Sequence, residues 1–173
     1  MRTLGIRTTF STGMAIFVLV IAVLIPLAVG GASSVITRSA MTQYNSFNKP
    51  ALSPPGWLFP VAWTILYILM GLASGIVFLS DCDPDVKRTA LIIYVVQLVF
   101  NFFWSIFFFN MSLYLFSFIW LLAMWMMVIA CTVLFWIANR AAGMMMLPYI
   151  AWSTFAAYLN LAVYLMSRKP MPL

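Results

Sequence analysis

Charged residues are confined to the ends of long apolar stretches, and this placement constrains the fold more than any other feature of the chain. The sequence has nine Lys or Arg and three Asp or Glu, and none of them falls within residues 8–37, 50–80, 89–139 or 141–167. About 20 apolar residues, each rising about 1.5 Å, are enough to cross a hydrocarbon core of about 30 Å. Because backbone groups inside lipid must pair within the chain, such segments have to be helical. The sequence therefore predicts an all-α integral membrane protein.

The charge-free stretches predict a bundle of five membrane-spanning helices. Residues 89–139 form a run of 51 residues, which is too long for one crossing, and the polar residues Asn110 and Ser112 near its middle mark the break. Charged residues make up 7% of the sequence, against about 25% in soluble proteins, so little chain remains for a soluble domain. We therefore expect one multi-pass domain over residues 1–173 in a bacterial cell membrane, with helices at about 13–33, 56–79, 89–109, 114–137 and 143–167.

The first stretch also has features of a cleavable signal peptide, because Arg2 and Arg7 precede its apolar core and small residues follow it. Its uncharged core, from Gly13 to Gly30, is longer than the roughly 7–15 residues typical of signal peptides. We therefore expect a retained helix, kinked at Pro26.

The net charge of +6 could indicate nucleic-acid binding. The Lys and Arg residues are instead scattered singly or in pairs at the ends of the apolar stretches, where cations anchor helices to lipid headgroups. We therefore expect the lipid bilayer, and no nucleic acid, as a partner. The acidic segment Asp81–Asp85 could suggest a cation site, but a turn in which Asp85 caps the next helix explains it as well, and no metal is predicted.

Loop 1, at residues 34–55, is the one long connection that the predicted helices leave. A long connection in an otherwise compact protein is often a lid or a binding element. Its end, from Lys49 to Trp57, contains Pro50, Pro54 and Pro55, which fix the backbone and should make this arm stiff. We expect loop 1 to cover a binding pocket.

The groups available for chemistry inside the membrane are all neutral. The sequence has no histidine, and the predicted spans contain no Asp, Glu, Lys or Arg. This excludes histidine-ligated haem, ordinary acid–base or nucleophilic catalysis, and the usual ion-coupling residues of pumps. What remains are polar and aromatic side chains at helical spacing. They are Trp63, Tyr67 and Ser74 on the second helix, Tyr94, Gln97, Asn101, Trp104 and Ser105 on the third, and Tyr149, Trp152, Ser153, the small Ala156 and Asn160 on the fifth.

Two interpretations of these stripes stay open. Amides and hydroxyls in membrane helices commonly bond to neighbouring helices, and Trp and Tyr commonly lie at the membrane interface. Alternatively, three facing stripes form a cavity for a large, flat, mostly apolar ligand, because Trp63, Asn101 and Trp152 lie too far inside their spans for an interfacial belt. A GxxxG element at Gly71 and Gly75 permits close helix contact, with contact between subunits as one option.

Several of these segments resemble the translocator protein family, also called TspO/MBR or tryptophan-rich sensory protein. The resemblance covers roughly residues 43–168, in the right order and with the family's five spans. It implies a homodimer that needs no cofactor and binds porphyrin, haem, sterols or benzodiazepine-type compounds in a pocket beneath loop 1. The segments that carry it are Lys49-Pro50, Pro54-Pro55-Gly56-Trp57, Trp63-Thr64, Tyr67, Gln97, Asn101, Trp104-Ser105, Leu147 to Trp152 and Phe155 to Asn160.

The resemblance also assigns roles residue by residue. Trp63 and Trp152 match two pocket tryptophans implicated in light-driven porphyrin breakdown, and they are the only candidates for catalytic residues. The family's tryptophans before the loop tyrosine and after Lys-Pro are Gln43 and Leu52 here, so the lid side of the pocket is less aromatic. The predicted ligand-binding residues are Tyr44, Trp63, Tyr67, Gln97, Asn101, Trp104, Tyr149, Trp152, Ala156 and Asn160.

Three functions are consistent with these observations. The first is a membrane receptor or transporter for tetrapyrroles and related hydrophobic ligands, which the aromatic stripes and the resemblance favour. The second is an enzyme that degrades porphyrin with light and oxygen, using Trp63 and Trp152 as redox-active side chains. The third is a structural or regulatory partner of another membrane protein. We expect the first, and no enzyme activity beyond a photo-oxidation of porphyrin.

Overall fold

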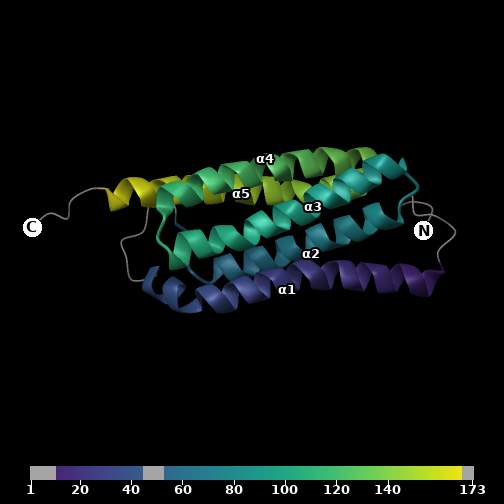
Figure 1. The fold of residues 1–173 in the computed structure, drawn as a ribbon. Helices are drawn as coiled ribbons and strands as arrows, with labels where there is room; N and C mark the ends of the chain where they lie inside the picture. Colours follow the sequence, from purple (N-terminus) through teal and green to yellow (C-terminus); the bar gives the residue numbers. More distant parts are fainter. Residues whose placement is uncertain (1–10, 45–52, 169–173) are drawn as a thin grey trace, which may run out of the picture.

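The protein is a bundle of five long helices. The computed structural model describes residues 11–44 and 53–168, with side chains up to residue 39 in the first of these segments. All five helices are long and apolar enough to cross a membrane, which confirms the predicted all-α membrane fold. The helices lie side by side along one direction (Figure 1), and they are α1 (Thr12–Tyr44), α2 (Leu58–Leu79), α3 (Pro84–Ser105), α4 (Tyr114–Ala138) and α5 (Arg140–Ser167).

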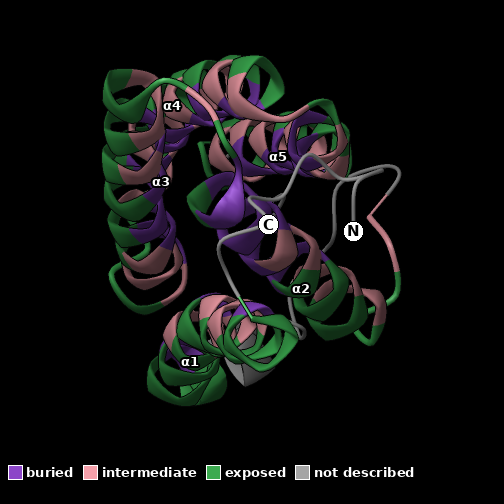
Figure 2. Cartoon of the chain, turned by 90° about the vertical axis from the view of Figure 1, so that its right-hand side faces the viewer, coloured by how far each residue is buried: buried purple, intermediate pink, exposed green. Residues whose placement is uncertain are grey.

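The helices pack in a ring whose order differs from their order in the sequence. Helix α1 packs on α2, α2 on α5, α5 on α4 and α4 on α3, and the C-terminal end of α3 returns to α1. Viewed end-on, the buried residues face the centre of the bundle, and α1 lies at its edge with most of its surface exposed (Figure 2). This order brings α3 and α5 next to the α1–α2 pair, so the predicted polar stripes face the interior.

The prediction of a loop over residues 34–55 is wrong for its first half, because α1 continues to Tyr44. Ser33, Ser34 and Thr37 are polar, but Thr37 returns its hydroxyl to the backbone oxygen of Ser33 over 2.9 Å. Such a bond satisfies a polar side chain within the helix, and Ser33 and Thr37 are buried against the bundle. Tyr44 therefore ends α1, while residues 45–52 lie outside the described residues.

Helices α3 and α5 begin earlier than predicted, because capping side chains extend both of them. Helix α3 begins at Pro84, since the Asp83 carboxylate accepts hydrogen bonds from the backbone N–H groups of Asp85 at 2.8 Å and Val86 at 3.3 Å. The prediction of Asp85 as the cap was thus wrong by two residues. Helix α5 begins at Arg140, where the Asn139 side chain caps the first turn in the same way.

The break near Asn110 occurs as predicted and takes the form of a π-helical turn. Segment η2 (Ile106–Asn110) continues α3 with wider turns, and the N–H of Met111 bonds to the oxygen of Ile106 at 3.1 Å. Ser112 then adopts a φ of 52°, a left-handed conformation that reverses the chain towards α4. Single π turns often occur at functional sites, and this one places Phe108 and Phe109 beside the cavity described below.

The GxxxG element joins α2 to α1 of the same chain. A Cβ added to Gly71 would lie 2.6 Å from the Cα of Val23, and one added to Gly75 would lie 2.9 Å from a methyl group of Leu19. Such contacts are closer than any side chain permits, so both glycines allow the two helices to touch. The option of a GxxxG contact between subunits is therefore not the one that the fold uses.

Candidate functional site

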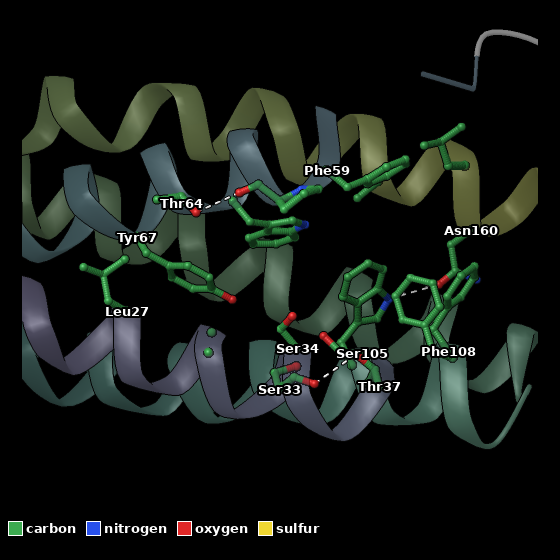
Figure 3. A pocket seen from close by; sticks show the side chains of 18 residues that line it. Leu27, Ser33, Ser34, Thr37, Phe59, Thr64, Tyr67, Ser105, Phe108 and Asn160 are labelled. Carbon is green, nitrogen blue, oxygen red and sulfur yellow. Dashed lines mark hydrogen bonds between the residues drawn. The ribbon is translucent and has the colours of Figure 1, made fainter. Parts of the chain in front are cut away.

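One cavity opens between α1, α2, α5 and the junction of α3 with η2. Its volume is about 300 Å³, and it is partly enclosed. The lining residues at its opening are exposed, with Gly31 and Ser34 on α1 and Pro60 and Thr64 on α2. Figure 3 shows the side chains that line it, which are Leu27, Gly30, Gly31, Ser33, Ser34, Thr37, Phe59, Pro60, Trp63, Thr64, Tyr67, Trp104, Ser105, Phe108, Phe109, Ala156, Leu159 and Asn160.

Trp63 is the centre of an aromatic wall formed by Phe59, Trp63, Tyr67, Trp104 and Phe108. Its ring stacks on Tyr67 with 5.6 Å between centroids and lies 6.1 Å from the ring of Trp104. Trp104 in turn stacks on Phe108 at 5.7 Å. These separations are typical of favourable aromatic pairs, so the wall presents a large and well-packed apolar surface to the cavity.

The side of the cavity that faces the α2 part of this wall, at Phe59, Trp63 and Tyr67, carries hydroxyl groups. Ser33, Ser34 and Thr37 come from α1, and Ser105 comes from the end of α3 (Figure 3). Gly30 lies on the same face of α1 as Ser33, Ser34 and Thr37, and its missing side chain leaves room for the ring of Tyr67. The cavity therefore has one aromatic side and one side that can hydrogen-bond.

Behind the aromatic wall, a buried hydrogen-bond network joins α2, α3 and α5. The Tyr67 hydroxyl donates to Asn101 Oδ1 at 2.7 Å, and Asn101 Nδ2 donates to the Tyr149 hydroxyl at 3.0 Å. Tyr149 then donates to Gln97 Oε1 at 2.9 Å. Gln97, Asn101 and Tyr149 are almost completely buried and do not belong to the described lining. Tyr67 does line the cavity, and these three residues hold it in a fixed position.

A second network fixes the other end of the wall. The Trp104 indole N–H donates to Asn160 Oδ1 at 3.1 Å, and the Ser117 hydroxyl donates to the same oxygen at 3.1 Å. Asn160 Nδ2 completes the group by donating to the backbone oxygen of Tyr114 at 2.8 Å. Asn160 thereby ties α5 to α3 and α4 while its side chain still reaches the cavity.

The predicted ligand-binding residues thus fall into four groups. Trp63, Tyr67, Trp104, Ala156 and Asn160 line the cavity, and Gln97, Asn101 and Tyr149 support it from behind. Trp152 is not among the described lining residues. It packs edge-to-face on Phe59 at 6.1 Å, and its buried indole N–H has no hydrogen-bond partner in the described part of the chain. The side chain of Tyr44 lies outside the described residues.

Sequence reasoning missed the contribution of α1 and two aromatic residues of the wall. Gly30, Ser33, Ser34 and Thr37 lie around the end predicted for the first span or in the predicted loop. Their spacing of three, four and seven residues from Gly30 is the signal that could have placed them on one face of a longer helix. Phe59 and Phe108 gave no comparable signal, because phenylalanine is common throughout the spans.

Comparison with known proteins gives the family. The model of the TspO/MBR family matches residues 22–165, which is most of the chain. The chain belongs to the TspO/MBR family. The tryptophan-rich protein TspO of Archaeoglobus fulgidus is 38% identical over 157 residues, covering 89% of this chain and 99% of that protein. TspO of Chlorobaculum tepidum is 33% identical over 138 residues, covering 79% of this chain and 87% of that protein. Protein CrtK of Rhodobacter capsulatus is 35% identical over 130 residues, covering 75% of this chain and 81% of that protein.

Membership of the TspO/MBR family confirms the resemblance seen in the tryptophan-rich segments. With five apolar spans, the chain is a multi-pass integral membrane protein, and its matches include proteins from bacteria. The family implies a receptor- or transporter-like role in the membrane.

Proposed function

We propose that this TspO/MBR protein binds flat hydrophobic ligands, with tetrapyrroles such as protoporphyrin and haem as the first class, in the cavity between α1, α2, α3 and α5. The observation that carries the proposal is the aromatic wall around Trp63, which offers stacking surface on one side of a partly enclosed space. The cavity volume of about 300 Å³ is at the lower end of the range of about 300–1,000 Å³ for ligand sites. A macrocycle would therefore enter with one edge and extend through the opening between α1 and α2.

Binding of this kind suits a receptor or a passive carrier better than a pump. The cavity is lined by neutral side chains, and residues 141–167 and 50–80, which contain its α5 and α2 walls, carry no charge. A coupled transporter would need an ionisable group near the membrane midplane to exchange a proton or an ion. Sterols and benzodiazepine-type compounds are further candidate ligands, since they share the flat apolar shape. The homodimer is a separate proposal, which light scattering of the detergent-solubilised protein tests.

A titration of the purified protein with protoporphyrin IX, in the dark and under illumination, tests the function. Trp63→Phe keeps a ring but removes the indole, so we expect affinity to fall by about 1 kcal/mol, or about fivefold. Trp136→Phe is the matched control, because Trp136 is 41% exposed on α4 and outside the cavity lining; its affinity should equal that of the wild type. Absence of saturable binding to the wild type would refute the proposal.

The illuminated arm of the same experiment addresses the alternative of a porphyrin-degrading enzyme. That reaction was predicted to use both Trp63 and Trp152, but only Trp63 is among the described residues that line the cavity. We therefore expect no light-dependent product that requires both indoles. A defined product that disappears in Trp63→Phe and in Trp152→Phe, while both variants still bind porphyrin, would make the protein an enzyme.

A further inference from the structure

We propose that the hydroxyl groups of Ser33, Ser34 and Ser105 recognise hydrogen-bond acceptors along one edge of the ligand. The cavity then selects flat molecules that carry carboxylate or carbonyl oxygens on one edge and are apolar elsewhere. This inference rests on the proposed function, since it concerns the orientation of a ligand in the same cavity. These three serines are called the hydroxyl edge below.

The first argument is that the hydroxyl edge has unused hydrogen-bonding capacity. Ser33 is only 4% exposed and lines the cavity, and none of the three serine hydroxyls makes a side-chain hydrogen bond to a described residue. A buried hydroxyl usually finds a partner, and serine in a helix commonly bonds back to the preceding turn. Because Ser33 does neither within the described structure, its hydroxyl is available to a ligand.

The second argument is that most other polar groups of the cavity are already engaged. Tyr67 donates to Asn101, and Trp104 donates to Asn160. Thr37 and Thr64 return their hydroxyls to the backbone of their own helices at 2.9 and 2.8 Å. Besides the hydroxyl edge, the Trp63 indole N–H is the other donor of the described lining that makes no hydrogen bond to a described residue. Polar recognition is thus concentrated at α1 and the end of α3.

The third argument is geometric. The hydroxyl edge lies on the side of the cavity that faces the aromatic wall of α2 (Figure 3). A ring that stacks on Trp63 with one face and enters with one edge brings the oxygens of that edge into the space between the wall and these hydroxyls. No carboxylate of a described residue lines the cavity, so nothing there favours a cationic or donor-rich rim.

The test compares two porphyrins on the full-length protein in detergent or nanodiscs. Protoporphyrin IX carries two carboxylates on one edge, and octaethylporphyrin has the same macrocycle with alkyl groups alone on its rim. We expect the wild type to bind protoporphyrin IX more tightly. Each of Ser33→Ala, Ser34→Ala and Ser105→Ala should weaken protoporphyrin binding about two- to tenfold, which corresponds to one lost hydrogen bond, and should leave octaethylporphyrin binding unchanged.

Ser39→Ala is the matched control, since Ser39 is an exposed serine of α1 outside the cavity lining. Unchanged octaethylporphyrin affinity also shows that each variant is folded. Ser34→Thr, which keeps a hydroxyl at the opening, should retain the preference for protoporphyrin IX. If the wild type binds both porphyrins and the serine variants keep the wild-type preference, the hydroxyl edge is refuted while the proposed function stands. If the wild type binds neither porphyrin, both fail.

Discussion

Replacing Gly30 by alanine should disturb the aromatic wall more than any other single methyl group added to the cavity. An ideal Cβ at Gly30 would lie 2.7 Å from both Cδ2 and Cζ of Tyr67, and closer still to Cε2. The ring cannot turn away freely, because its hydroxyl is bonded to Asn101 at 2.7 Å and its face is stacked on Trp63. Either the ring moves and this bond breaks, or α1 moves away from α2.

The size of the effect follows from three contributions. Inserting a methyl group into packed structure costs about 1–3 kcal/mol, and a lost buried hydrogen bond between membrane helices costs about 0.6 kcal/mol on average. The higher helix propensity of alanine returns at most about 1 kcal/mol. We therefore expect Gly30→Ala to lower the free energy of unfolding by about 1–3 kcal/mol and to weaken ligand binding at the wall.

Gly31 provides the control, because the next residue of the same helix has no atom within 4 Å of its added Cβ. Gly31→Ala should raise the free energy of unfolding by up to about 1 kcal/mol through helix propensity alone. Equilibrium unfolding in mixed micelles, followed by circular dichroism, measures both variants. In a Tyr67→Ala background the ring is absent, so the cost of Gly30→Ala should vanish. Equal stability of the Gly30 and Gly31 variants would refute the contact between Gly30 and Tyr67.

Three further predictions test the packing that supports the cavity. Gly71→Ala would place a Cβ 2.6 Å from the Val23 Cα and should destabilise the fold by at least about 2 kcal/mol. Gly13→Ala is the control and should not destabilise it, because no atom lies within 4 Å of its added Cβ. Equal unfolding curves for the two variants would contradict the α1–α2 contact. Asn160→Leu leaves the Trp104 indole without a partner and removes one of two side-chain donors to the Tyr114 oxygen, the other being the Ser117 hydroxyl. It should cost about 2 kcal/mol. Ser117→Ala removes one donor to Asn160 and should cost less than half as much. A larger cost for Ser117→Ala than for Asn160→Leu would show that Asn160 does not join the three helices. Lys87→Met loses the hydrogen bonds to the backbone oxygens of Phe78 and Ser80 at 3.0 and 2.6 Å. It should lower the free energy of unfolding by about 0.5–1 kcal/mol and leave porphyrin affinity unchanged. A changed affinity would show coupling along α2.

The length of α1 shows where sequence reasoning fails. Ser33, Ser34, Thr37 and Arg38 read as the polar end of a span, because a polar residue facing lipid is costly. In the structure Ser33 and Thr37 face the bundle, and Thr37 bonds to its own helix. The cost is therefore not incurred, and the helix continues to Tyr44. Which way a polar residue of a membrane helix faces depends on its neighbouring helices, and a single sequence does not contain that information.

The stripes on α3 and α5 show the same limit within the site. Helical periodicity placed Gln97, Asn101 and Trp104 on one face, and all three are buried. Periodicity does not distinguish a residue that lines a cavity from one that bonds to the next helix. The Tyr149 hydroxyl donates a hydrogen bond to Gln97 and accepts one from Asn101. Trp104 instead lines the cavity. Some residues of the stripes therefore bond to the next helix, while others line the cavity, and ligand binding there stays a prediction.

The sequence by itself determined that five helices cross the membrane and where the chain turns between α2, α3, α4 and α5. It did so because an uncharged stretch of sufficient length has one stable arrangement in lipid, in which each backbone group bonds within its own helix. Only the tertiary structure decided that α1 supplies one side of the cavity, that Trp63 lies at the centre of its aromatic wall and that Trp152 packs behind Phe59. These outcomes depend on the order of the helices in the ring and on contacts as short as that between Gly71 and Val23. Both arise from packing between segments far apart in the chain, which the local pattern of residues does not specify.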